Sequence, residues 1–115
     1  MFKIKYYYRT GDSFSSRDEE DVLEFDWENL DVAKQCLQRI KEHYKWYESH
    51  HSYSGEKLPK PDWYNPKSYD KYEPDMGIIN LITDDGEDFQ FWAPWCGHFE
   101  TLYGAEIVLN EKISF

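Results

Sequence analysis

Residues 92–100 (WAPWCGHFE) form the most unusual stretch of the sequence, because two Trp, one Cys, one His and one Glu lie within it. One interpretation is a nucleophilic Cys96 with His98 as its base, since an adjacent imidazole activates a thiol. Two residues apart on an extended chain, the two side chains would lie roughly 6–7 Å apart, beyond hydrogen-bond reach. No third group that could orient His98 is evident, so the sequence favours packing or an aromatic-walled recognition corner over catalysis.

Metal and nucleotide chemistry lack a matching motif. The imidazoles do not follow a chelating spacing such as H-E-x-x-H, and two cysteines are too few for a structural zinc knuckle. The turn residues 10–13 (TGDS) could cradle a phosphate with their backbone amides, but the glycine-rich phosphate-binding motifs are absent. The sequence therefore predicts no metal and no cofactor. The four imidazoles are those of His43, His50, His51 and His98.

Acidic residues gather in two clusters, residues 18–21 and residues 84–88, and neither has the spacing of a calcium-binding loop. One interpretation is that they form solvated turns, which also keep sheet edges from pairing with other chains. Another is that carboxylates spaced along one face imitate a phosphate backbone and occupy the basic groove of a nucleic-acid enzyme. The Lys and Arg residues of the predicted helix count against the second interpretation, since they interrupt the acidity.

The net charge excludes some classes of partner. Thirteen Lys and Arg oppose 23 Asp and Glu, which gives −10 at neutral pH. Direct binding to nucleic acid or to an anionic membrane needs a basic surface, so the charge favours a basic protein partner instead. The first ten residues lack an apolar signal-peptide core, and no apolar run is long enough to span a membrane, so we expect a cytoplasmic location.

The pattern of apolar residues predicts a single α+β domain over residues 1–115, with one long helix packed on an antiparallel sheet of about five strands. Residues 29–47 have the helical spacing, with Asn29 as N-cap. Period-two alternation predicts strands at 2–9 and 23–27, separated by a polar loop, and further strands are predicted at 77–83, 89–92 and 105–109. The expected buried face of the helix consists of Ala33, Cys36, Leu37, Ile40, Tyr44 and Tyr47.

Residues 50–75 are predicted to form a long irregular connection, because four prolines interrupt a run rich in Tyr, Lys, Ser and Asp. A connection of this length is uncommon in a compact domain and is either a linker or functional. The chain has 22 aromatic residues, ten of them Tyr, more than a core of this size buries with its hydroxyls satisfied. Surplus Tyr and Trp are typical of binding surfaces.

Three segments together resemble small proteins encoded by tailed bacteriophages: YYYRTGDSF, NLDVAKQCLQRIKEHYKWY and WCGHFETLYGAEIV. The similarity covers both ends of the chain and omits the Pro- and Tyr-rich middle. It implies an accessory protein made in the host cell cytoplasm during infection, and such small acidic proteins often bind and disable a host enzyme or defence complex. No residue-level role follows from it.

The leading hypothesis is a non-enzymatic acidic binding protein, a phage-encoded inhibitor of a host defence system such as CRISPR or other nucleic-acid-directed machinery, acting by protein–protein binding. Aromatic anchors would supply affinity and carboxylates would steer a basic partner. Two alternatives are a sponge that stacks a nucleotide second messenger between aromatic rings, and a small enzyme that uses His98 with Glu100 or Asp12. The predicted contact surface consists of Trp63, Tyr64, Tyr69, Tyr72, Trp95, His98, Asp84, Asp85, Glu87 and Asp88.

Overall fold

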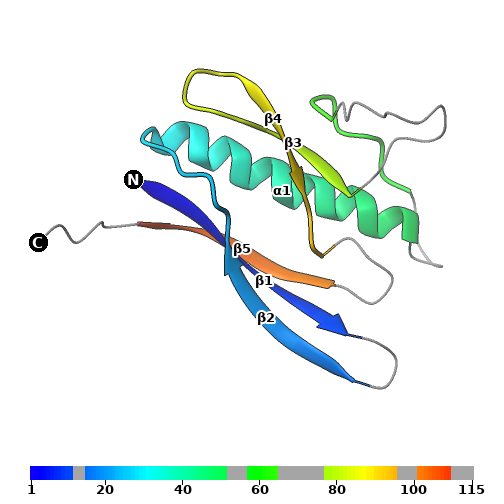
Figure 1. Cartoon of the computed structure of the whole chain (residues 1–115). Coiled ribbons are helices and arrows are strands. Elements are labelled where there is room, and N and C mark those ends of the chain that lie inside the picture. Colours follow the sequence, from blue (N-terminus) through cyan, green and yellow to red (C-terminus); the bar gives the residue numbers. More distant parts are fainter. Residues whose placement is uncertain (12–14, 52–56, 65–76, 96–100, 110–115) are drawn as a thin grey trace, which may run out of the picture.

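The computed structural model describes residues 1–11, 15–51, 57–64, 77–95 and 101–109, and within them the predicted α+β class is confirmed. In the described part of the chain, one helix packs against two antiparallel sheets, one of three strands and one of two (Figure 1). The elements in chain order are β1 (Phe2–Gly11), β2 (Ser16–Val22), α1 (Leu30–His51), β3 (Ile78–Ile82), β4 (Asp88–Trp92) and β5 (Thr101–Leu109).

The three-stranded sheet has the order β2-β1-β5, so β1 is central and the other two strands are its edges. Alternation along β1 buries Ile4 and Tyr6, whereas Lys3, Lys5 and Tyr7 are only half-buried, as expected for a strand with one covered face. The last strand pairs with β1 from Thr101 onward and therefore begins four residues earlier than predicted.

Strands β3 and β4 form the second sheet as a hairpin. The turn predicted at residues 84–86 is confirmed: the Gly86 amide donates to the Thr83 carbonyl oxygen at 2.9 Å, and the Thr83 amide donates to the Glu87 carbonyl oxygen at 2.9 Å. Gly86 has a φ of 85°, the left-handed conformation that a three-residue hairpin loop needs at its last position. Residues 78–81 of β3 are all buried, which makes β3 the strand most enclosed by the fold.

The N-terminus of α1 is capped as the sequence predicts, because the Asn29 side-chain oxygen accepts a hydrogen bond from the Asp31 amide at 2.9 Å. The buried face of α1 differs from the predicted one in the C-terminal half of the helix. His43 and Trp46 are buried, whereas Tyr44 and Tyr47 are only half-buried. The stripe turns toward His43 and Trp46 because the ring of Tyr64, from the following segment, lies 5.4 and 4.7 Å from their ring centroids.

The second strand is not where the sequence places it. Residues 16–21, expected in a polar loop, form β2, whereas residues 23–27 leave the sheet after two further backbone contacts. Leu23 donates to the Ile4 carbonyl oxygen at 2.9 Å, and Trp27 exchanges hydrogen bonds with Phe2 at 2.7 and 2.8 Å. Alternation was misleading here because residues 23–27 bury Leu23 and Trp27 while crossing toward the second sheet, and β2 is an edge strand whose charged side chains remain solvated.

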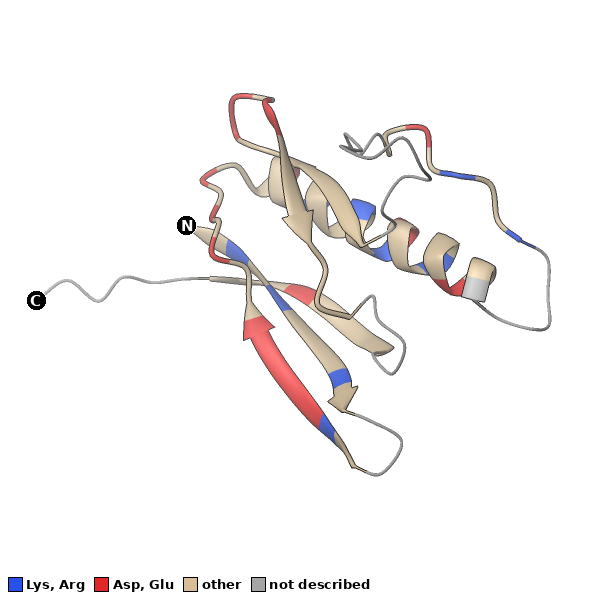
Figure 2. Cartoon of the chain, turned by 45° about the vertical axis from the view of Figure 1, so that its right-hand side comes forward, with Lys and Arg blue, Asp and Glu red and all other residues tan. Residues whose placement is uncertain are grey.

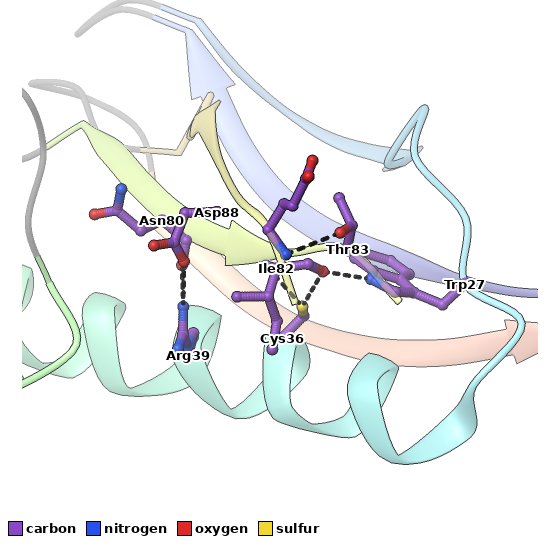
Figure 3. A network of polar contacts seen from close by, with 8 residues as sticks. Trp27, Cys36, Arg39, Asn80, Ile82, Thr83 and Asp88 are labelled. Carbon is purple, nitrogen blue, oxygen red and sulfur yellow. Dashed lines mark hydrogen bonds and ion pairs between the residues drawn. The ribbon is translucent and has the colours of Figure 1, made fainter. Parts of the chain in front are cut away.

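The two sheets are joined by side chains and by α1, since the described strands of one sheet do not pair with those of the other. The Trp27 indole N–H donates to the Ile82 carbonyl oxygen at 2.7 Å, and the same oxygen accepts a contact from the Cys36 thiol at 3.4 Å (Figure 3). Burial raises the pKa of this Cys36 thiol, which keeps it protonated and able to donate. Phe25 packs on Phe89 across the same gap, with ring centroids 4.6 Å apart.

Replacing Trp27 by Phe is expected to lower the free energy of unfolding by about 2–3 kcal/mol, because a buried hydrogen bond and part of a buried ring are lost together. The matched control is Trp92→Phe, because Trp92 is 65 % exposed whereas Trp27 is 0 % exposed. We expect the control to change the free energy by less than about 0.5 kcal/mol. Urea denaturation measures both, and equal effects would contradict the linking role of Trp27.

Candidate functional site

A groove of about 510 Å³ lies between the end of β2 with its following segment and the strand β4. Its walls are mainly aromatic, and two carboxylates stand among them. The aromatic rings form two pairs: Tyr6 lies 6.2 Å from Phe91 and Phe25 lies 4.6 Å from Phe89 between ring centroids. The residues that matter for its chemistry are Tyr6, Phe25, Phe89, Phe91, Asp21 and Glu24.

The groove is suited to a cation. Asp21 and Glu24 are exposed carboxylates, and aromatic faces attract a cation through their ring quadrupole. Burial of the phenol, followed by the negative charge of Asp21, raises the pKa of Tyr6 to about 12. Tyr6 is therefore a neutral hydroxyl at physiological pH and adds no charge of its own.

Strand β2 borders the groove and carries four successive acidic residues at positions 18–21. Figure 2 shows the acidic colour along this strand and basic residues on the neighbouring β1. The cross-strand ion pairs are long and exposed: Lys5 lies 3.5 Å from Glu20, and Arg9 lies 3.4 Å from Asp18. Exposed pairs of this kind contribute about 0–1 kcal/mol, so a partner's cations could replace them at little cost.

The backbone of β2 also has an open side. Leu23 donates to Ile4 on β1, and antiparallel strands alternate between residues whose amides face the partner strand and residues whose amides face away. The alternation therefore directs the amides of Asp18, Glu20 and Val22 toward the outer edge. The Val22 amide is occupied there by the Asp21 carboxylate at 2.8 Å. No other strand of the described residues pairs with this edge.

Two predicted aromatic anchors are buried. Tyr64 is 1 % exposed and packs on the helix, and Trp95 is 0 % exposed and stands edge-on to Tyr6 at 4.9 Å between ring centroids. The prediction that these rings form part of a contact surface is corrected by their burial. Trp63 and Tyr64 hold the 57–64 segment against the helix. The Trp63 indole N–H donates to the Glu42 carboxylate at 2.7 Å, and this hydrogen bond lowers the pKa of Glu42.

The predicted carboxylates of the 84–88 turn have different roles. Asp84 accepts hydrogen bonds from the amides of Glu28 and Asn29 at 2.9 and 3.1 Å, so it holds the turn against the start of α1. Asp88 lies 3.8 Å from Arg39, whose guanidinium also lies 5.3 Å from the centroid of the Trp63 ring. The structure thus links Trp63 to Asp88 through a helix residue.

Asp85 and Glu87 are exposed at the tip of this turn, and their side chains make no hydrogen bond or ion pair with any other described residue. Tyr69, Tyr72 and His98 of the predicted surface lie outside the described residues, as do Cys96, Glu100 and Asp12 of the catalytic interpretations. Across the residues that the structure does describe, no group of three His, Cys, Asp or Glu side chains comes together as a metal site would need.

Sequence reasoning missed the groove and the strand beside it. The rings of Tyr6, Phe25, Phe89 and Phe91 come from three separate segments, and their convergence depends on how the two sheets are placed. One signal was available for β2: the basic residues Lys5 and Arg9 of the first strand are followed by the acidic run at 18–21. A hairpin that pairs Arg9 with Asp18 also brings Lys5 near Glu20, and opposite charges on neighbouring strands favour such pairing.

No family model matches the chain, and no curated protein or solved structure is significantly similar to it. The described part of the chain contains no helix that is both long and apolar enough to cross a membrane. Functional arguments therefore depend on the groove and on the edge of β2.

Replacing Asp84 by Ala is expected to lower the free energy of unfolding by about 1 kcal/mol, because two amides at the start of α1 lose their acceptor. Asp85→Ala is the matched control, since the neighbouring carboxylate is exposed and its loss should cost less than about 0.5 kcal/mol. Chemical denaturation compares the two variants. An equal loss in both would show that the Asp84 hydrogen bonds do not hold the turn to the helix.

Alkaline titration of the phenols, followed by ultraviolet absorbance, should show one tyrosine that ionises near pH 12, and Tyr6→Phe should remove it. The pKa of Tyr6 is raised on folding, so the stabilisation that this proton provides is complete below about pH 10 and is lost as the pH rises through about 12. If the wild-type and Tyr6→Phe titrations differ instead by a phenol that ionises near pH 10, the groove does not bury Tyr6 as described.

Proposed function

We propose that this chain is a non-enzymatic binding protein that recognises a basic protein partner along β2 and in the adjoining aromatic groove. The observation that carries the proposal is the juxtaposition of an open, carboxylate-rich strand edge with a groove lined by Tyr6, Phe25, Phe89 and Phe91. The contact surface proposed from the structure thus differs from the predicted one. It replaces the buried Tyr64 and Trp95 with the groove and β2.

Electrostatics and packing have separate roles in this proposal. Exposed carboxylates mainly accelerate encounter with a basic partner and exclude acidic ones, because their pairs are screened by water and salt. Aromatic side chains in a groove provide contact area at low cost in conformational entropy. The net charge of −10 supports a protein partner over nucleic acid or an anionic lipid surface.

The resemblance to tailed-phage proteins suggests which partner to expect. Enzymes and complexes that handle nucleic acid present basic grooves, and a row of carboxylates on β2 could occupy one. On this proposal the chain acts in the host cell cytoplasm as an inhibitor of a nucleic-acid-directed defence system, CRISPR interference among them. It would act by covering a basic surface, with no chemical step.

A nucleotide sponge is the second candidate, because an aromatic groove can stack a base. Asp21 and Glu24, however, line the same groove and would repel phosphate groups, so its charge favours a cation over a nucleotide. Protein purified with a bound nucleotide would show excess absorbance at 260 nm, where the bases absorb. That result would favour the nucleotide sponge over the protein-binding function.

The test compares two double variants with the same change in net charge. Asp18→Asn with Glu20→Gln removes two carboxylates from β2, and Asp85→Asn with Glu87→Gln removes two from the hairpin turn. Affinity purification from bacterial lysate, followed by quantitative mass spectrometry, should recover the same basic proteins with wild type and with the turn variant. We expect the β2 variant to recover about tenfold less at low salt, because two charge contacts are lost.

If the β2 variant recovers as much of the same proteins as wild type at every salt concentration, β2 is not part of the binding surface and the proposal is wrong. Thermal unfolding of the three proteins controls for folding. Both double variants should unfold at nearly the wild-type temperature, because all four side chains are exposed.

A further inference from the structure

We propose that the partner contributes an extended segment with Lys or Arg residues on both of its faces, and that this segment pairs with the outer edge of β2 as a fourth strand of the β2-β1-β5 sheet. This inference rests on the function proposed above and names the binding mode of the same site. Strand addition uses main-chain hydrogen bonds for affinity and side-chain pockets for specificity, and β2 offers both.

The backbone of β2 is open at its outer edge. Because the Leu23 amide points to Ile4, the amides and carbonyls of Asp18 and Glu20 face away from β1 and are available to another strand. At the end of the edge, the Val22 amide already donates to the Asp21 carboxylate at 2.8 Å. The open edge is therefore confined to residues 16–20, which is long enough for three to four residues of an incoming strand to pair.

Charge decides which kind of strand can pair with the outer edge of β2. Two copies of β2 placed edge to edge would bring carboxylates opposite carboxylates, and like charges across a strand pair are destabilising. A basic strand would instead place opposite charges across from each other, which stabilises the pair. Its side chains on one face approach Asp18 and Glu20, and those on the other face approach Glu19 and Asp21. Arg17, the basic side chain of this edge, is already paired with Glu19 at 2.7 Å. The surplus of carboxylates thus disfavours a second copy of this chain and favours a segment rich in Lys or Arg.

The aromatic groove can receive one side chain of the added strand. Asp21 lies on the same face of the sheet as Tyr6, its cross-strand partner, and both residues line the groove. A Lys or Arg side chain that leaves the added strand on this face enters between the aromatic rings, where Asp21 and Glu24 neutralise its charge. Such a cation–aromatic contact contributes about 0.5–2 kcal/mol, and the bidentate guanidinium fork favours Arg.

The experiment uses the full chain and a capped eight-residue peptide in which Arg-Arg-Val-Val is repeated twice, so that Arg occurs on both faces of the added strand. Binding is measured by fluorescence anisotropy. Two variants at one position separate backbone from charge. Glu20→Gln removes the carboxylate alone, whereas Glu20→Pro removes the carboxylate and the outward N–H. Proline is tolerated on an edge strand where its nitrogen faces solvent, so the pairing with β1 is preserved. We expect Glu20→Gln to weaken binding by about threefold and Glu20→Pro by about tenfold more.

A second measurement does not depend on how the variants fold. The same peptide, N-methylated on two consecutive central residues, retains every charge but loses a backbone donor on both of its edges. We expect wild-type protein to bind it at least about tenfold more weakly than the unmodified peptide. Equal affinity for the methylated peptide, or equal affinity of Glu20→Gln and Glu20→Pro for the unmodified one, would overturn strand addition.

The outcomes also separate this inference from the proposed function. If backbone changes have no effect but a peptide with Glu in place of Arg fails to bind, the site recognises basic chains without strand addition, and only the inference fails. If the Arg and Glu peptides bind alike, or neither binds wild type at low salt, the recognition of basic protein segments fails as well.

Discussion

Trp27 is the residue on which the arrangement of this small domain depends. Its backbone pairs with Phe2 at the start of the central strand β1, and its indole N–H donates to the Ile82 carbonyl oxygen of the second sheet, so this residue ties the two sheets together. Aromatic rings fill the space that strand pairing leaves. Among the described residues the two sheets do not pair with each other, β2 remains an edge strand, and the groove lies beside it.

Local patterns in the sequence predicted most of the elements, because helices, hairpins and half-buried strands have strong local signals. The helix stripe through Ala33, Cys36 and Ile40 and the turn at Gly86 are confirmed. Strand β2 could not be predicted in the same way. Its successive acidic residues lack alternation, and an edge strand that is solvated on both faces needs none. Its position follows from pairing with β1, which is a tertiary constraint.

The candidate site was less predictable, since a site depends on which distant segments meet. Trp95 was expected at the surface, but its ring packs edge-on against Tyr6 from the other end of the chain, and Tyr64 is buried against His43. The general expectation of an acidic, aromatic binding surface from composition stays a prediction. We propose that this surface lies at β2 and the adjoining groove, not at the turn. Net charge alone could not distinguish the two acidic clusters.

Amide hydrogen exchange along β2 tests the central claim most directly, because the claim is that this edge is open and accepts a basic strand. In the free protein the Asp18 and Glu20 amides should exchange much faster than those of Glu19 and Asp21, which face β1. Addition of the Arg/Val peptide should slow Asp18 and Glu20 selectively. Uniform exchange along the strand, or protection that appears on β5 instead, would contradict the account.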